Sequence, residues 1–380
     1  MNERKHYLDW LKAVAIWVLV IAHIFRIMDY PSFYVKHGQH LWADLSLRFL
    51  DLWFMPLFFV IGGMAAYHSI EKRGLQKFKK DRARRLLLPF VVSLFTILPI
   101  TGYFAYLAHY PASELNFFAY YPKFFQFNVK QLQGFTGNFT PGHLWYLVFV
   151  YLFSVWSGPI FHRIEDKGMP LKSRQFPLLF AIGCLTFSKL TALPYPNPLY
   201  FWAYFCLGYA ISSQKFEFAI FSSLQKRPLL VLAVTIAMTV WMSVLRVVYL
   251  PQHGPVWLYF AMQPVYCTTA LLWVLILLYY AQKYFNTTNS VLQYLNNMAI
   301  YVYIVHMPFV VFYGYLFSNK MTAPVAFFAN LFCSYISLFV LYELVVRHIP
   351  PLRALFGITD LSVTSIFPLG VPRSGERTSI

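Results

Sequence analysis

The sequence contains few charged residues for its length. Asp, Glu, Lys and Arg make up 12% of the 380 residues, whereas soluble domains contain about 25% charged residues. Hydrophobic residues make up 59%, and apolar runs long enough to cross a bilayer recur along the chain. This composition excludes an ordinary soluble domain and indicates a multi-pass membrane protein embedded in the lipid bilayer.

Acidic residues are especially scarce, with 14 Asp and Glu against 31 Lys and Arg. The excess positive charge does not indicate nucleic-acid binding, because the basic residues follow the expected topology. With the N-terminus inside, the cytoplasmic segments hold 22 of the 31 basic residues and the opposite side holds five. These cytoplasmic segments are 1–9, 69–85, 162–176, 214–227, 281–297 and 347–380. The positive-inside rule therefore predicts that both termini are cytoplasmic.

We predict an all-α fold of about ten transmembrane helices. The expected spans are 10–28, 51–68, 86–109, 143–161, 177–192, 199–213, 228–247, 257–280, 298–317 and 323–346. They form one domain over residues 1–356, followed by a polar cytoplasmic tail, 357–380, that we expect to be disordered. The first span lacks a small-residue cleavage site, so we expect it to be retained.

The four cysteines fall within the expected spans. Their spacing is not that of metal ligands, so we expect reduced core residues and no metal site.

Two ionisable residues, Lys12 and His23, interrupt the first span. They are eleven residues apart, so on a helix they share one face, roughly 16 Å apart along the axis. Ionisable groups at membrane depth usually face a protein-lined or wet cavity. The alternative is a lysine that reaches the interface and a histidine bonded to a neighbouring helix.

The basic loop 71–85 runs directly into the third span. Arg82 and Arg85 end this loop, three residues apart and so on one face of a helix. Guanidinium groups there suit phosphate oxygens of a lipid or of a nucleotide-bearing donor. Positive-inside anchoring is the alternative explanation for the cluster as a whole.

Three further polar residues enter apolar segments. His143 begins the fourth span, His306 lies two residues before Pro308 in the ninth, and Glu343 is near the inner end of the tenth. Pro308 should kink its helix and free backbone groups. Taken singly, each such side chain is more often a packing partner satisfied by a neighbouring helix than a catalytic group. Asp9 and Asp51 flank the first two spans as candidate ion-pair partners for Lys12 or Arg48.

The chain resembles the acyltransferase-3 family of integral-membrane acyltransferases. The matching segments, in the family's order, are LDWLKAVAIWVLVIAH (8–23), MPLFFVIGGM (55–64), RARRLLLPF (82–90), HLWYL (143–147), YIVHMPF (303–309) and LYELVVR (341–347). Two positions depart from the family pattern. The usual arginine of the first segment is Lys12, and the common Phe-Ile-Ser-Gly reads Val60-Ile61-Gly62-Gly63.

The resemblance implies an O-acyltransferase of the bacterial inner membrane. His23 would be the catalytic residue, as a general base on a sugar hydroxyl or as the carrier of a covalent acyl group. Lys12, Arg82 and Arg85 would bind the donor. That donor is a substrate, succinyl-CoA or acetyl-CoA, and no tightly bound cofactor is expected. The substrate-binding residues would be His143, Trp145, His306 and Glu343.

Within the family, the chain looks most like members that succinylate periplasmic glucans, with glycan-assembly proteins as further partners. Acetylation of a surface polysaccharide is the alternative. Two hypotheses that assign the protein to other functional classes also stay open. One is a proton-coupled transporter using Lys12, His23, His306 and Glu343, and the other is a non-catalytic partner in glycan assembly.

Overall fold

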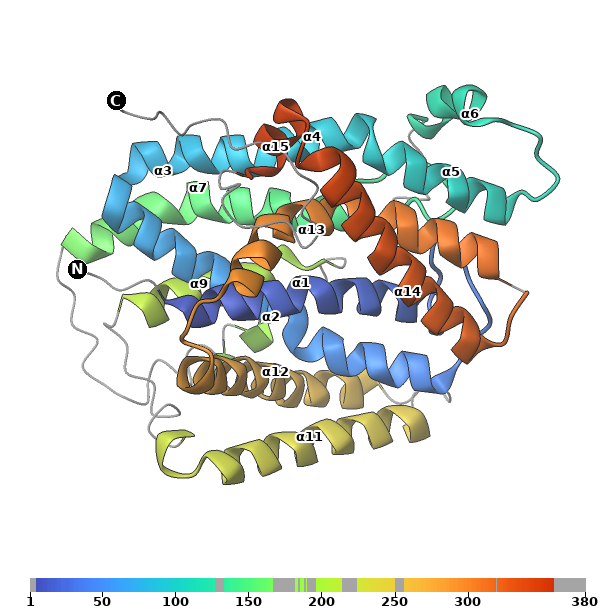
Figure 1. Ribbon diagram of the computed structural model, residues 1–380. Helices are drawn as coiled ribbons and strands as arrows, with labels where there is room; N and C mark the ends of the chain where they lie inside the picture. The colour runs from blue at the N-terminus through green and yellow to red at the C-terminus, as the bar shows by residue number, and fades with distance from the viewer. Residues whose placement is uncertain are drawn as a thin grey trace, which may run out of the picture.

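The computed structural model describes residues 5–126, 133–166, 182–183, 185–187, 189, 196–213, 224–249, 256–318 and 320–358. All regular secondary structure in these ranges is helical. Most of the long helices run in roughly one direction, α14 crosses them obliquely, and the short helix α6 lies beside α5 (Figure 1).

The helices follow one another along the chain with these bounds. They are α1 (His6–Arg26), α2 (Leu41–Arg73), α3 (Leu75–Arg82), the π-helix η1 (Ala83–Leu87), α4 (Leu88–Phe95), α5 (Ile97–His109), α6 (Phe117–Phe124), the 3₁₀-helix η3 (Gly142–Leu144), α7 (Trp145–Asp166), α9 (Pro198–Ser212), α11 (Pro228–Tyr249), α12 (Val256–Tyr284), α13 (Ser290–Phe317), α14 (Ala323–Leu341), the π-helix η5 (Tyr342–Val346) and α15 (Pro350–Phe356).

Seven helices in the described part of the chain are long and apolar enough to cross a membrane. An eighth span results if Leu75–Phe95 and Ile97–His109, which meet at a bend of 41°, count as one. The expected span 199–213 corresponds to α9, whose 15 residues are fewer than the roughly 20 that a bilayer requires. The expected span 177–192 lies mostly outside the described residues, as does nearly all of the tail 357–380. The fold is therefore a helical multi-pass membrane protein, and the expected total of ten spans is not confirmed.

Helix α1 lies among α2, α12, α13 and α14 and contacts all four (Figure 1). Its indole at Trp17 stacks on Phe339 of α14, with ring centroids 4.9 Å apart, and the hydroxyl of Tyr335 donates to the Trp17 carbonyl at 2.9 Å. Because α1 is unbroken from His6 to Arg26, Lys12 and His23 share one continuous helix, as expected.

Helices α2 and α9 approach each other at the level of their backbones. A Cβ added at Gly63 would lie 1.9 Å from the Phe205 carbonyl oxygen, and one at Gly208 would lie 2.0 Å from that of Val60. Both distances are far below van der Waals contact, so these two positions require glycine. This close packing fixes α2, and the Phe58 carbonyl of α2 in turn accepts a hydrogen bond from the Tyr146 hydroxyl of α7 at 3.3 Å.

We predict that Gly63→Ala destabilises the protein while Gly62→Ala is tolerated. The added methyl group at Gly63 meets backbone atoms that cannot move aside, whereas one at Gly62 would lie 3.6 Å from the Phe205 ring, an ordinary contact. Overpacking of this kind costs about 1–3 kcal/mol or more. The thermal midpoint of each purified variant in detergent measures the effect, and equal midpoints would contradict the proposed backbone contact.

Candidate functional site

Three histidines from separate parts of the sequence meet inside the helical bundle. His23 comes from α1, His143 from η3 and His306 from α13. The ring centroid of His306 lies 4.9 Å from that of His23 and 4.9 Å from that of His143. The rings of His23 and His143 are 6.4 Å apart. We call these three residues the histidine cluster.

Pro308 accounts for the position of His143. The proline nitrogen carries no hydrogen, so the carbonyl four residues earlier, that of Ile304, loses its helical donor. His143 Nε2 lies 3.0 Å from this Ile304 oxygen. Because a carbonyl can only accept, Nε2 of His143 carries the proton and Nδ1 holds the lone pair. His143 Nδ1 is buried and has no hydrogen-bond partner among the described residues.

The same reasoning assigns the protons of the other two histidines. His306 Nδ1 lies 3.0 Å from the Val302 oxygen and 2.9 Å from that of Tyr303, so Nδ1 is protonated and Nε2 is an acceptor. His23 Nδ1 lies 2.9 Å from the Leu19 oxygen and 3.4 Å from His306 Nε2. Its Nδ1 proton is therefore shared between two acceptors, and the lone pair of His23 is on Nε2.

Burial distinguishes the members of the cluster. His306 is fully buried, with 0% of its surface exposed, and His143 is 8% exposed. His23 alone is partly exposed. His23 is therefore the member that a substrate can reach most easily, and its unprotonated Nε2 is suited to accept a proton or attack a carbonyl carbon.

Arg82 and Arg85 lie in different surroundings. Arg82 is half-buried, with its guanidinium carbon 5.2 Å from the centroid of the Phe78 ring, and it interacts electrostatically with Tyr146. Arg85 is exposed. The π-helix η1 begins directly after Arg82, and its wider turn changes the direction of the side chains that follow. Only Arg82 thus points toward the interior.

A row of aromatic rings leads from Tyr146, the electrostatic partner of Arg82, to the histidine cluster. The Tyr146 ring is 5.7 Å from that of Tyr303, and the Tyr303 ring is 5.8 Å from that of His143. The Tyr303 hydroxyl also donates to the His143 carbonyl. Arg82 therefore lies beside a row of side chains that leads to the cluster.

The remaining expected site residues lie in other contacts. Glu343 is buried, accepts from the Tyr294 hydroxyl at 2.7 Å and pairs with Arg347 at 3.0 Å. Trp145 packs against aromatic rings, with its centroid 5.3 Å from that of Phe201. Lys12 is half-buried on α1. The structure thus brings His143 and His306 to His23 and places Glu343 in a separate ion pair.

A loop covers the histidine cluster at the far end of α1. Phe33, from the α1–α2 connection 27–40, is buried with its ring 6.3 Å from that of His23. Its ring also lies 5.6 Å from that of Phe135, and the ring of Tyr34 lies 5.1 Å from Phe135. We call segment 27–40 the outer cap, because the topology expected from the positive-inside rule places it outside the membrane. A substrate that arrives from this end must pass it.

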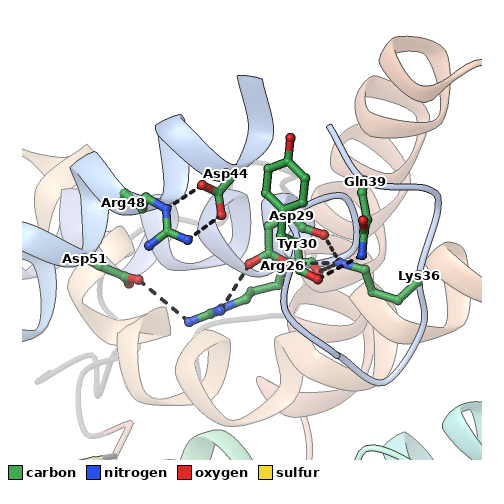
Figure 2. A network of polar contacts seen from close by, with 8 residues as sticks. All are labelled: Arg26, Asp29, Tyr30, Lys36, Gln39, Asp44, Arg48 and Asp51. Atoms are coloured by element: carbon green, nitrogen blue, oxygen red, sulfur yellow. Dashed lines mark hydrogen bonds and ion pairs between the residues drawn. The ribbon is translucent and has the colours of Figure 1, made fainter. Parts of the chain in front are cut away.

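Buried charges hold the outer cap to the end of α1 (Figure 2). The Asp29 carboxylate is 1% exposed and pairs with Lys36 at 2.9 Å and with Arg26 at 3.1 Å. Lys36 also donates to the Arg26 carbonyl at 3.0 Å. Burial raises the pKa of Asp29 and lowers that of Lys36, and their mutual attraction opposes both shifts. The Asp29–Lys36 ion pair therefore fixes the position of the cap, although removing its two charges from water costs free energy.

The roles of Asp29 and Arg26 were not predicted from the sequence. Their spacing of three residues at a span's end was the available signal, because residues i and i+3 on a helix are neighbours. The partners of Asp51 and Arg48 could not be assigned from the sequence either. In the structure Arg48 pairs with Asp44, while Asp51 lies 3.7 Å from Arg26 (Figure 2).

Comparisons with known proteins give matches over nearly the whole length of the chain. Residues 5–343 match the family model described as an acyltransferase domain. The chain is also similar to the glucans biosynthesis protein C of Escherichia coli strains O139:H28, SMS-3-5 and K12 / DH10B. Each is 21% identical over 380 residues, covering 93% of this chain and 94% of the relative. No solved structure matches the chain.

We predict that Asp29→Asn destabilises the protein and Asp51→Asn has little effect. Removal of the Asp29 charge leaves Lys36 and Arg26 without their buried counter-ion, and breaking a buried pair costs roughly 3–5 kcal/mol. Asp51 is 42% exposed and its contact is longer, so its loss should cost about 1 kcal/mol or less. Thermal midpoints in detergent compare the two, and a larger drop for Asp51→Asn would contradict the assignment.

Proposed function

Because the chain belongs to the acyltransferase family, we propose that it moves an acyl group from cytoplasmic acyl-CoA to a hydroxyl of a periplasmic glycan. The proposed acceptor is a glucan and the proposed acyl group is succinyl. The likeness to glucans biosynthesis protein C supports the acceptor. The observation that carries the proposal is the histidine cluster, in which a partly exposed His23 presents an unprotonated Nε2.

His23 would act on the incoming hydroxyl. As the sugar oxygen attacks the thioester carbonyl, His23 Nε2 takes the hydroxyl proton. The new C–O bond forms, the C–S bond breaks, and the same proton passes to the leaving thiolate of CoA. His23 is thereby returned to its neutral form. In the alternative two-step route, Nε2 itself attacks the thioester carbonyl, the C–S bond breaks, and CoA leaves as a thiolate. The sugar oxygen then attacks the acyl carbon on His23, the bond to Nε2 breaks, and the hydroxyl proton passes to the thiolate.

The donor would approach from the inner end of α1. Arg82, supported by Lys12 and by the exposed Arg85, would bind the phosphates of CoA. The pantetheine arm would then follow the aromatic path of Tyr146 and Tyr303 toward the cluster. Arg82 is the strongest candidate, because it is half-buried beside that path.

The acceptor would approach from the outer cap. The unpartnered Nδ1 of His143 would accept a hydrogen bond from a hydroxyl of the glycan. We propose that both termini are cytoplasmic, that the chain crosses the bacterial inner membrane ten times, and that Trp145 supports the acceptor site by packing. An acetyl group transferred to a surface polysaccharide is the alternative with the same site.

A proton-coupled transporter has weaker support. Its path requires Glu343 to exchange protons with the histidines. Glu343 instead accepts hydrogen bonds from Tyr294 and Arg347, so its oxygens are already engaged away from the histidines.

We expect His23→Ala to abolish acyl transfer. General-base catalysis contributes roughly 10²–10⁴-fold, and the variant should lose at least that much. Purified wild type and variant are incubated with succinyl-CoA or acetyl-CoA and glucan, and free thiol and the mass gain of the glucan are followed.

His109→Ala is the matched control, because His109 makes the same bond to the carbonyl four residues earlier, at 2.9 Å, on an exposed surface. Inverted membrane vesicles should release thiol from added acyl-CoA, and intact spheroplasts should not. A stable His23→Ala protein with over half of wild-type transfer would refute the role of His23. Neutral acetyl esters on a surface polysaccharide, with glucan unmodified, would refute only the acyl and acceptor assignments.

We further predict that Arg82→Ala raises the KM for acyl-CoA more than Arg85→Ala does. Charge-assisted bonds to phosphate contribute roughly 1.5–3 kcal/mol, which is about ten- to a hundredfold in KM, before discounting for solvent. Arg84→Ala, at an exposed position between the two, controls for loss of positive charge. If all three variants keep the wild-type KM, the arginines serve topology alone.

A further inference from the structure

His306 has no direct access to a substrate. It is fully buried, and its Nδ1 proton is shared by the Val302 and Tyr303 carbonyl oxygens. Its only lone pair, on Nε2, faces His23 Nδ1 at 3.4 Å. A substrate-binding role, which the sequence suggested for His306, would require this nitrogen to turn away from His23 and the two carbonyls.

We propose that His306 is a positioning residue for His23. It accepts a share of the Nδ1 proton of His23, and thereby holds the ring with Nε2 unprotonated and directed away from His306. This arrangement follows the rule that a catalytic base is oriented by a third group. The inference deepens the proposed function, since it assigns the tautomer on which proton transfer by His23 depends.

The backbone of α13 fixes His306 in the accepting state. If His306 Nε2 were protonated, two N–H groups would face each other at 3.4 Å, and two carbonyls would still require the proton on Nδ1. The neutral tautomer with an Nε2 lone pair is therefore the one that satisfies all three contacts of the His306 ring. During the reaction the Nδ1 proton stays on His23, and its bond to His306 strengthens as Nε2 gains the substrate proton.

Leu19 provides the second acceptor for the same proton, at 2.9 Å. This carbonyl belongs to α1 itself and lies one turn before His23, so it moves with the helix. His306 belongs to α13 and fixes the ring of His23 relative to the rest of the cluster. The two acceptors therefore restrict different motions, and the loss of His306 should leave the ring held only within its own helix.

The test uses two amides that each replace one ring nitrogen. In His306→Gln the side-chain amide reaches the position of Nε2 and can accept from His23. In His306→Asn the amide reaches the position of Nδ1, so the bonds to Val302 and Tyr303 can persist while the acceptor for His23 is lost. His306→Leu removes both. Size-exclusion chromatography in detergent confirms that each variant is folded.

We expect kcat to stay within a few fold of wild type in His306→Gln. It should fall roughly tenfold or more in His306→Asn and His306→Leu, a smaller loss than the ~10²–10⁴-fold contribution of the base itself. The KM for acyl-CoA should stay unchanged in all three variants. A merely structural role predicts the opposite order, with His306→Asn more active than His306→Gln, and that order would overturn the proposal.

A second readout needs no acyl donor. Diethyl pyrocarbonate modifies unprotonated imidazole nitrogens, and mass spectrometry of the His23 peptide gives the rate at that residue. We expect the rate to fall about two- to tenfold in His306→Asn and His306→Leu, as for the loss of one hydrogen bond, and to be retained in His306→Gln. Equal rates in all four proteins would overturn the positioning role. If wild type transfers no acyl group but the rates follow this series, the proposed function fails and the positioning role stands.

Discussion

The absence of one backbone hydrogen bond organises the interior of this protein. In an apolar environment a carbonyl without a donor costs several kcal/mol, so it must find a partner. Pro308 creates such a carbonyl at Ile304, and His143 supplies the donor at 3.0 Å. That bond places His143 beside His306, whose own proton is bound by two carbonyls of the same helix. The protonation pattern of the cluster thus follows from the hydrogen-bonding needs of α13.

The polar residues along α1 mark two ends from which the histidine cluster could be reached. Lys12 and the half-buried Arg82 belong to the end that carries the basic loop, and His23 lies roughly 16 Å from Lys12 along the helix. The outer cap, held by the buried Asp29, closes the other end. The proposed donor and the proposed acceptor would therefore reach the same histidine from opposite ends of α1 without crossing each other. A single continuous helix is sufficient to set that distance.

The sequence was enough to predict the helical membrane fold, most of the spans and the polar residues that interrupt them. Those properties depend on composition and on spacing within one helix, as for Lys12 and His23. The contact between His23 and His306 joins residues 283 positions apart, and only packing decides it. The surroundings of Arg82 and Arg85 also could not be read from their spacing, because the π-helix η1 changes the turn. Helix α9 reads as a span by hydropathy but is 15 residues long.

The polar residues within the spans differ in how many of their hydrogen bonds are made inside the protein. Residues with all of their bonds made stabilise packing, whereas residues with an unused donor or acceptor could bind another molecule. Glu343 is fully engaged by Tyr294 and Arg347, as expected for a residue that stabilises packing. His143 differs from Glu343. The Ile304 carbonyl needs only a hydrogen-bond donor, and a side chain that donates without carrying an acceptor atom would also satisfy it. A histidine leaves Nδ1 buried and unpartnered among the described residues, which costs about 1–3 kcal/mol. A hydroxyl group that donated to this nitrogen would recover that free energy, so His143, unlike Glu343, keeps hydrogen-bonding capacity that a bound polar molecule could use.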